Sequence, residues 1–412
     1  MGEIATFGEI VLVVAAAFSL ALFGRLLTER LAIPSAALFL VVAAVASDLV
    51  PELQDAISFV TVERVAVVAL VIILFDGGMQ IGWRRLRQSL VPILSLGLLG
   101  TFLTAALVAA AAHWLLGLSW ITGGLLGAAL APTDPAVTFS VLGGREVRGR
   151  TGTILKGESG ANDPVGIALM IGMIELATTD DGSFWTVVRE FSIEMAGGAV
   201  VGAAGAASLL WLTRRVHLPE PALYPLRALA FAGVIYGAAT LVHGSGFLAV
   251  FIAGVLIGDA PTPRKGEIEG FHSSLASLAE ITAFVVLGLT IDLGAVFGEG
   301  YWLDGLVLAL LLGFVIRPLA VGLLLLPVRL DRGERLFVMW SGLKGAVPIL
   351  LAALAVIAAV DDAAQIYGIV FVVVLLSVLL QGTFVPVVAD RLRVPMRRID
   401  YESMAVRAFR VG

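Results

Sequence analysis

The chain has 412 residues, of which 59% are hydrophobic and 14% are charged, and its mean hydropathy is +1.00. A soluble protein carries roughly 25% charged residues, so the composition excludes a soluble fold and predicts an all-α polytopic membrane protein. The absence of cysteine excludes disulfides, thiolate metal sites and a cysteine nucleophile. The net charge of −5 says little, because the placement of charge matters more than its sum in a membrane protein.

Apolar stretches of the length that crosses a bilayer, ~20 residues, recur along the chain. The first follows Glu3 and Glu9 rather than a basic segment, so it is interpreted as a transmembrane helix and not as a signal peptide. We predict thirteen spans, at about 9–28, 33–50, 62–82, 91–113, 118–142, 152–177, 191–212, 222–242, 244–259, 273–297, 303–327, 334–359 and 364–389.

Basic residues alternate between the connections of these spans. The connections after the odd-numbered spans, together with the C-terminal tail, hold 23 of the 27 Lys and Arg residues. Cytoplasmic connections are enriched in Lys and Arg, so the N-terminus is predicted outside and the C-terminus in the cytoplasm. Residues 393–412 are then a short cytoplasmic tail. The high ratio of arginine to lysine points to a prokaryotic plasma (inner) membrane.

Two predicted spans are interrupted near their middle. The fifth contains Ala-Pro-Thr-Asp-Pro at 131–135, and the twelfth contains Gly-Leu-Lys-Gly-Ala-Val-Pro at 342–348. Proline and glycine are tolerated in single transmembrane helices, but two interruptions with a buried charge in each favour a functional role. Their offset of seven spans predicts an inverted repeat, with helices 1–6 corresponding to helices 8–13 and with helices 5 and 12 crossing.

The charged residues of these interruptions suit the ends of half-helices. Crossed broken helices bring two positive N-termini and two negative C-termini to the membrane midplane. Asp134 is expected to offset the N-termini, and Lys344 is expected to offset the C-termini.

The sixth span carries two carboxylates within Glu-Ser-Gly-Ala-Asn-Asp-Pro at 158–164. An ionised group at the bilayer centre costs at least ~2.5–3.5 kcal/mol, so such residues are candidates for an ion or proton pathway. Ser159 and Asp163 share a helix face and are the predicted cation ligands, with the amide of Asn162 orienting the carboxylate. Glu158 is expected to pair with Arg317, an isolated guanidinium in the eleventh span.

Other ionisable residues have weaker assignments. Asp76, in Leu-Phe-Asp-Gly-Gly at 74–78, is either a further ligand, a carboxylate of the entry funnel or a helix-end residue near water. The four histidines, His113, His217, His243 and His272, lie at span ends or in connections, where solvated side chains are expected.

Taken together, residues 133–135, 158–164, 317 and 342–348 make the chain resemble the NhaP-type branch of the cation–proton antiporters, along essentially its whole length. The resemblance implies a homodimer in which a bundle, at about 91–177 and 303–389, moves against a dimerisation scaffold at about 1–82 and 191–297. It also implies that Asp163 binds Na⁺ or K⁺ and a proton in turn, helped by Ser159, the Thr133 backbone and Asp76. The Asn-Asp pair is associated with electroneutral one-for-one exchange.

The expected function is therefore secondary antiport of Na⁺, Li⁺ or K⁺ against H⁺, serving pH homeostasis, without a cofactor, an enzymatic reaction or a nucleic-acid partner. A cation channel using the same carboxylates is an alternative, although no filter-like loop is visible. A sodium-coupled organic-anion symporter is a second alternative, which Asp134 at the half-helix N-termini disfavours. An intramembrane aspartyl protease built on Asp134 and Asp163 is a third, but the chain lacks a Gly-x-Gly-Asp segment.

Overall fold

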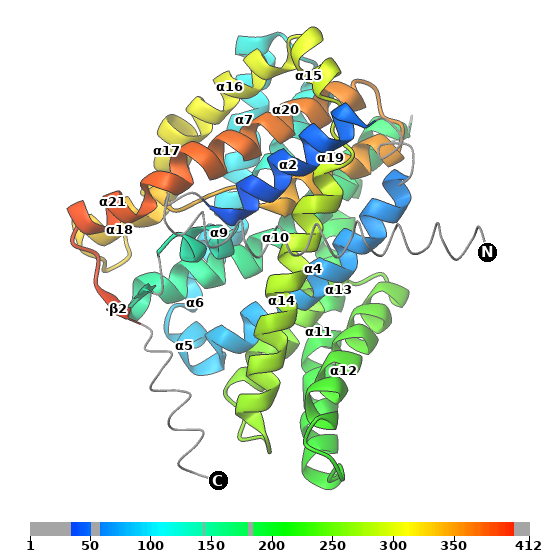
Figure 1. Ribbon diagram of the computed structural model, residues 1–412, viewed down its shortest axis with the longest axis vertical. Coiled ribbons are helices and arrows are strands. Elements are labelled where there is room, and N and C mark those ends of the chain that lie inside the picture. The colour runs from blue at the N-terminus through cyan, green and yellow to red at the C-terminus, as the bar shows by residue number, and fades with distance from the viewer. Residues whose placement is uncertain (1–33, 51–57, 143–144, 180–183, 399–412) are drawn as a thin grey trace.

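The computed structural model describes residues 34–50, 58–142, 145–179 and 184–398. The predicted first span, 9–28, and residues 399–412 of the predicted tail lie outside the described residues. Within the described part, helices account for the whole fold apart from one two-stranded sheet (Figure 1).

One group of helices is built around α4 (Phe59–Ile81), which packs against α13 and α14. Close packing of α4 on α13 depends on small residues, because a Cβ at Gly78 would lie 2.5 Å from the carbonyl oxygen of Phe251. Figure 1 shows α11 and α12 on the outer side of this group. Its other helices are α2 (Ser35–Leu49), α11 (Phe184–Arg215), α12 (Leu223–Leu241), α13 (Gly246–Gly258) and α14 (Lys265–Gly288).

A second group contains the segments that carry most of the predicted site residues. Within it α8 packs against α7, α10 and α19, while α20 packs against α16 and α19. Its helices are α7 (Thr101–Leu116), α8 (Trp120–Leu130), α9 (Pro135–Ser140), α10 (Gly149–Thr178), α16 (Tyr301–Leu311), α17 (Arg317–Leu324), α18 (Arg332–Trp340), α19 (Ala346–Ile357), α20 (Ala363–Leu376) and α21 (Thr383–Arg391).

Three π-helical segments interrupt long helices of the second group. They are η1 (Ser95–Gly100), η2 (Leu312–Ile316) and η3 (Ser377–Gly382). In such segments a widened turn leaves backbone carbonyls free for other donors; the hydroxyl of Thr101, for example, donates to the carbonyl of Gly97 at 2.6 Å. The remaining short helices are α5 (Trp83–Gln88), α6 (Leu90–Leu94) and α15 (Leu293–Gly298).

Eleven of the other twelve predicted spans overlap one helix or an interrupted series of helices in the described part. By length and apolar composition, six helices in the described part are able to cross a membrane, and four shorter apolar helices accompany them. The number thirteen therefore stays a prediction. The range 273–297 is wrong: α14 begins earlier, at Lys265, and ends at Gly288. Asp292 accepts a hydrogen bond from the Ala295 N–H at 2.8 Å and starts the separate helix α15.

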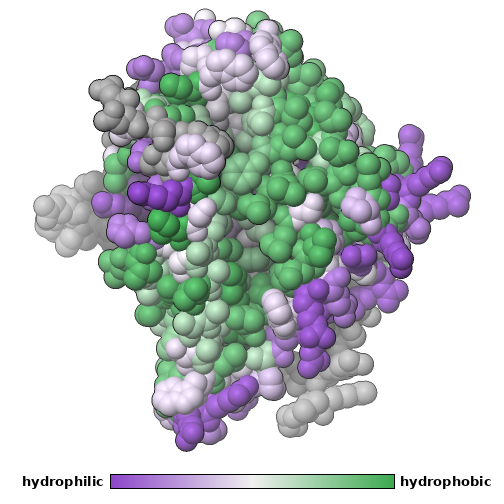
Figure 2. Space-filling view, turned by 180° about the vertical axis from the view of Figure 1, so that it is seen from behind, coloured by the Kyte–Doolittle hydropathy of each residue, from purple (hydrophilic) through white to green (hydrophobic). Residues whose placement is uncertain are grey.

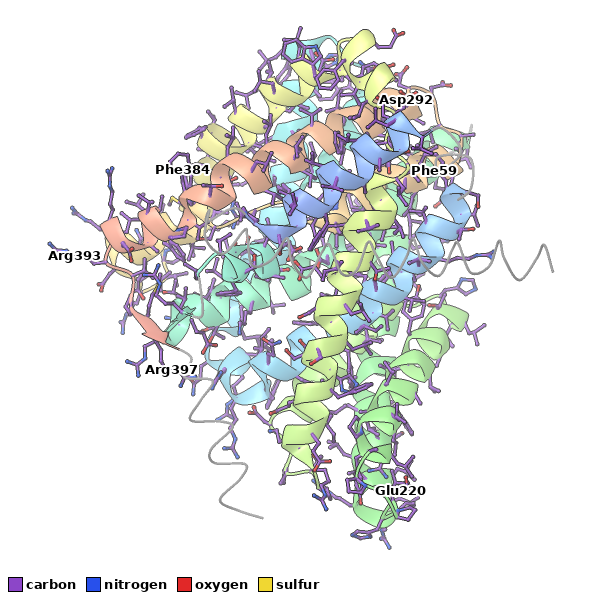
Figure 3. All side chains as sticks on the ribbon, viewed as in Figure 1. Phe59, Glu220, Asp292, Phe384, Arg393 and Arg397 are labelled. Carbon is purple, nitrogen blue, oxygen red and sulfur yellow. The ribbon has the colours of Figure 1, made fainter. Side chains whose placement is uncertain are left out.

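The surface is apolar over a broad region. Figure 2 shows hydrophobic side chains across the middle of one face, with hydrophilic residues gathered toward its ends. Large side chains there and elsewhere are well exposed, including Leu241 (83%) and Trp114 (72%). Soluble monomers rarely expose patches of this extent, which fits a lipid-facing surface. In Figure 3, Glu220 lies at the opposite end of the molecule from Asp292, and Arg393 and Arg397 lie along one side.

The sheet joins the end of the described chain to the segment before α10. Strand β1 (Arg145–Val147) pairs antiparallel with β2 (Met396–Arg398), with Glu146 opposite Arg397. Arg145 also forms an ion pair with Asp390 at 2.8 Å. The start of the predicted tail is thus bound to the rest of the fold, which its basic composition did not indicate.

Candidate ion-binding site

The two interruptions expected in the fifth and twelfth spans lie side by side. Helix α8 ends at Leu130 and α9 begins at Pro135, while α18 ends at Trp340 and α19 begins at Ala346. The backbone N–H of Asp134 donates to the carbonyl of Leu343 at 2.8 Å. This bond connects the non-helical segments directly, so the polar backbone freed by each break is concentrated at one place.

Lys344 lies at the C-terminal end of α8. Its side chain is 1% exposed, and its Nζ donates to the carbonyls of Ala131 at 3.2 Å and Pro132 at 2.8 Å. A positive charge at these carbonyls interacts favourably with the negative end of the helix dipole.

Asp134 lies at the N-terminal ends of two half-helices. Its Oδ1 accepts a hydrogen bond from the Ala136 N–H at 2.8 Å, which caps α9. A Cβ added to Gly345, the residue before α19, would overlap Asp134 Oδ2. The carboxylate therefore lies against the starts of both α9 and α19, where a negative charge interacts favourably with the positive ends of the helix dipoles.

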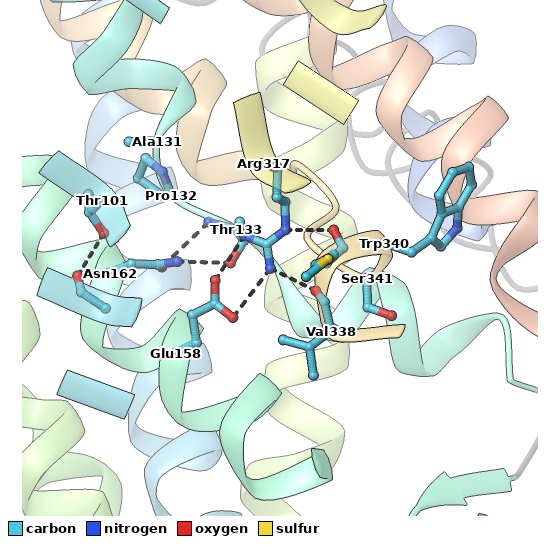
Figure 4. Close-up of polar contacts among 12 residues, drawn as sticks. Thr101, Ala131, Pro132, Thr133, Glu158, Asn162, Arg317, Val338, Trp340 and Ser341 are labelled. Carbon is cyan, nitrogen blue, oxygen red and sulfur yellow. Dashed lines mark hydrogen bonds and ion pairs between the residues drawn. The ribbon is translucent and has the colours of Figure 1, made fainter. Parts of the chain in front are cut away.

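Asn162 links α10 to the first interruption. Its amide nitrogen donates to the Thr133 hydroxyl at 2.8 Å, and its amide oxygen accepts from the Thr133 N–H at 3.4 Å (Figure 4). The amide thus holds the extended segment after α8, and its role in orienting Asp163 stays a prediction.

Asp163, the next residue of α10, is 5% exposed. Its Oδ1 is fully buried and has no hydrogen-bond partner among the described residues. Ser159 lies one turn earlier on the same helix and is equally buried. An ionised carboxylate oxygen that is buried without a hydrogen-bond donor is costly, and a proton or a cation would lower that cost.

Glu158 and Arg317 lie together as a buried ion pair (Figure 4). Arg317 NH1 is 2.9 Å from Oε1 of Glu158 and NH2 is 3.3 Å from Oε2, and both residues are less than 5% exposed. Such bidentate geometry is the strongest that the two groups can form.

The same guanidinium serves a second purpose. It donates to the carbonyls of Met339 at 3.1 Å and Val338 at 3.2 Å, near the C-terminal end of α18. A Cβ at Gly342 would overlap Arg317, which explains a glycine at that position.

Sequence reasoning missed the polar side chains that support the second interruption. Ser377, in η3, accepts a hydrogen bond from the Lys344 N–H at 3.0 Å, and Gln381 donates to the Trp340 carbonyl. Thr138, in α9, donates to the Ser341 carbonyl at 3.0 Å. Ser377 and Gln381 are polar residues four apart in an apolar run, and this spacing was an available signal.

Asp76 belongs to a different network. It is 5% exposed, and its Oδ2 accepts a hydrogen bond from Gln80 at 2.6 Å. Gln80 in turn accepts from Lys156 Nζ at 3.3 Å. The described contacts therefore lead from Asp76 toward the end of the molecule that carries β2, and not to Asp163.

One of the histidines departs from the expected solvated position. His272 is completely buried in α14, packs on Phe75 with ring centroids 5.4 Å apart and bonds through Nδ1 to the Ile268 carbonyl at 2.8 Å. The prediction was wrong for this residue because α14 begins at Lys265, which places His272 within the helix.

The predicted ligand residues have the chemistry of an alkali-cation site. No group of three or more His, Cys, Asp or Glu side chains able to hold a metal occurs among the described residues. The residues predicted as cation ligands, Asp163, Ser159 and Thr133, carry oxygen atoms, which are the ligands that hard cations prefer.

Comparison with known proteins assigns the chain to a family. The family model described as the transmembrane sodium/hydrogen exchanger matches residues 17–391. The chain belongs to the sodium/hydrogen exchanger family. It is 34% identical over 408 residues to the K⁺/H⁺ antiporter NhaP of Alkalimonas amylolytica. This match spans 97% of this chain and 70% of that protein.

Two further similar proteins are also named as antiporters. The K⁺/H⁺ antiporter NhaP2 of Shewanella sp. (strain ANA-3) is 34% identical over 86% of this chain, and the match spans 62% of that relative's length. The solved structure of the sodium proton antiporter MjNhaP1 from Methanocaldococcus jannaschii superposes with a TM-score of 0.76 at 25% identity, over 93% of this chain and 99% of that one. These relatives are transporters and not enzymes.

Proposed function

We propose that this exchanger-family protein exchanges Na⁺, Li⁺ or K⁺ for H⁺ by competitive binding at Asp163. The observation that carries the proposal is the buried Oδ1 of Asp163, which lacks a hydrogen-bond donor in the described structure. Asp163 directly follows Asn162, whose side chain binds Thr133 in the first interruption. The names of the relatives, which include both K⁺/H⁺ and Na⁺/H⁺ antiporters, support antiport and leave all three cations as candidates.

The mechanism follows from the cost of charge in the membrane. Asp163 is negatively charged when empty, and either a proton or a cation neutralises it. A neutral, occupied site crosses the bilayer interior at far lower cost than a bare carboxylate. Because the two passengers compete for one group, each return of the site carries one or the other, and the exchange is electroneutral and one for one.

The fixed charges around Asp163 play a supporting role in this proposal. Lys344 and Asp134 offset the half-helix ends, while the Glu158–Arg317 pair neutralises itself and holds α10 near α18. Ser159, one turn before Asp163 on α10, and the Thr133 backbone are proposed to supply further oxygen ligands to the cation. Asp76 is proposed to belong to the cytoplasmic entry to the site rather than to the binding shell.

Alternating access is proposed to come from movement of one group of helices against the other. The bundle comprises about residues 91–177 and 303–389, and the scaffold comprises about residues 1–82 and 191–297 and forms a homodimer. π-Helical segments in both the fourth and eleventh spans and interruptions in both the fifth and twelfth support an inverted repeat of thirteen spans. The cytoplasmic C-terminus and the inner-membrane location rest on the alternation of charge and on the bacterial relatives.

The test is cation-driven proton movement in proteoliposomes with a pH-sensitive dye, comparing Na⁺, Li⁺ and K⁺. Asp163→Asn should abolish exchange, because an amide cannot alternate between a charged and a neutral state. In the wild-type protein, acidification should raise the apparent KM for the cation without lowering the maximal rate, as competition requires. Asp292→Asn, at an exposed cap of α15, is the matched control and should exchange normally.

Full exchange by Asp163→Asn, with the variant folded and reconstituted as well as the control, would refute the assignment. Current that scales with membrane voltage would instead show that the exchange is not electroneutral.

A further inference from the structure

A concave, polar region lies beside the two-stranded sheet and is lined by none of Asp163, Ser159 or Thr133. A cavity of about 540 Å³ lies between α5, the start of α10 and the β1–β2 sheet. This volume falls in the range of small-molecule pockets, about 300–1,000 Å³. Figure 3 shows Arg397, one of its lining residues, at the outer edge of this region.

The lining of the cavity is strongly basic. Five cationic side chains, Arg85, Arg148, Arg150, Lys156 and Arg397, surround it together with a single carboxylate, Glu146. That carboxylate forms ion pairs with Lys156 at 3.3 Å and with Arg397 at 3.2 Å.

The other three cations, Arg85, Arg148 and Arg150, have no acidic partner within 4.0 Å among the described residues. Basic residues are common in cytoplasmic connections. That preference does not by itself explain why five basic side chains line one cavity with a single carboxylate.

The backbone adds to this positive potential. Helix α10 begins at Gly149 and runs for 30 residues, and neither a side-chain cap nor an acidic residue occupies its first turn. Residues 149–153 of this turn contribute Gly149, Arg150, Gly152 and Thr153 to the cavity lining. The first N–H groups of a helix lack intrahelical acceptors, and the helix dipole favours an anion at that position.

We propose that this cavity binds the phosphate group of an anionic ligand. Arginine matches the oxygens of a phosphate with paired N–H donors, and the open start of α10 supplies further donors. The volume exceeds what a bare phosphate fills, so the ligand is a phosphate ester: either a soluble phosphomonoester or the headgroup of an anionic lipid.

The cavity is connected by hydrogen bonds to Asp76, the proposed entry carboxylate. Lys156 lines the cavity and also donates to Gln80, which donates to Asp76. A phosphate would compete with Gln80 and Glu146 for Lys156 and so change the surroundings of Asp76. This consequence for transport rests on the proposed exchange function, whereas the binding itself does not.

The test measures binding directly, without transport. Purified protein in uncharged detergent is titrated calorimetrically with AMP, with adenosine as the ligand that lacks phosphate. In a second arm, protein from nanodiscs of phosphatidylglycerol or phosphatidylcholine is examined by native mass spectrometry for retained lipid. Saturable binding of AMP but not adenosine identifies a soluble phosphomonoester, and selective retention of phosphatidylglycerol identifies a lipid headgroup. Either result supports the site.

Variants decide whether the bound phosphate occupies this cavity. Arg85→Gln and Arg150→Gln should each weaken binding by about tenfold, the effect of removing one charge-assisted contact. Arg87→Gln is the matched control, because Arg87 is exposed on the same helix α5 but does not line the cavity. Equal losses in all three variants, or no phosphate-dependent binding in either arm, would overturn the proposal.

Discussion

At the scale of single residues, three polar side chains of α10, those of Glu158, Asn162 and Asp163, differ in whether their hydrogen bonds are satisfied. Glu158 is satisfied by Arg317 through two contacts, and Asn162 is satisfied by Thr133 through two more. Of these three side chains, Asp163 is the one that keeps a buried oxygen without a hydrogen-bond partner among the described residues. Because the first two groups are fully engaged, they are suited to hold the helix in place, and the third is available to exchange its partner.

The ion pair should respond unequally to loss of its two members. Arg317→Gln removes the partner of a buried carboxylate and frees two carbonyls of α18, and loss of one partner of a buried pair costs roughly 3–5 kcal/mol. Glu158→Gln should cost less, because the guanidinium keeps its bonds to Val338 and Met339. Thermal unfolding of the purified variants, followed by tryptophan fluorescence, measures the order.

The double variant Glu158→Gln/Arg317→Gln tests the coupling. Its loss of stability should be clearly smaller than the sum of the two single losses, because no unpaired charge remains. Additive losses would mean that the two residues do not stabilise each other.

A glycine in the second interruption should be intolerant of any side chain. Gly342→Ala would force Arg317 from its position, and such overpacking costs roughly 1–3 kcal/mol. Gly233→Ala on α12 is the control, since nothing lies within 4 Å of an added Cβ and alanine favours a helix by up to about 1 kcal/mol. The melting temperature should fall for the first variant and rise or stay unchanged for the second.

At the scale of elements, the second interruption is held by side chains from a neighbouring π-helical segment. Segment η3 places Ser377 and Gln381 toward residues 340–344, and α9 supplies Thr138 to the Ser341 carbonyl. A broken helix at membrane depth is stable only when such partners replace the lost helical bonds. The break therefore depends on elements that are adjacent in space, not on its own sequence alone.

Removing one of these hydrogen-bond partners should destabilise the interrupted segment between α18 and α19. Gln381→Leu leaves the Trp340 carbonyl without its side-chain donor and should cost roughly 1–3 kcal/mol, with a lower rate of cation exchange as the break loosens. Gln365→Leu, in the first turn of α20, is the matched control and should change neither quantity. Stability and exchange are measured on the same preparations. Equal behaviour of the two variants would argue against this role of η3.

At the scale of the whole molecule, contacts between the proposed bundle and scaffold decide which movements are possible. At the end of the molecule that carries the sheet, Lys156 of α10 bonds to Gln80 of α4 at 3.3 Å, which joins the two parts. Contacts such as Arg145 with Asp390 lie within the bundle. Only the first kind must break if the bundle moves.

Cross-linking can test that movement on a chain that has no cysteine of its own. Gln80→Cys/Lys156→Cys, joined by a short bifunctional thiol reagent with a reducible linker, should stop exchange, and reduction should restore it. Arg145→Cys/Asp390→Cys, joined in the same way within the bundle, should leave exchange intact. Continued exchange by the first cross-linked pair would show that these parts do not move relative to each other.

Local patterns in the chain were sufficient for much of this description. Hydropathy determined the membrane class and the position of most described helices, because an apolar run of about 20 residues has few other stable environments. Proline and glycine marked both interruptions, because each removes helical hydrogen bonds or helix preference locally. Charged residues within apolar spans drew attention to Asp163, Lys344 and Arg317.

Only the tertiary structure decided which groups satisfy one another. The bond of Asn162 to Thr133, the support of the break by Ser377 and Gln381, the burial of His272 and the pairing of β1 with β2 all join residues through packing. Hydropathy and spacing describe what each segment requires from its surroundings. The partner that meets the requirement depends on which helices pack side by side, and that is set by the fit of side chains across the whole molecule.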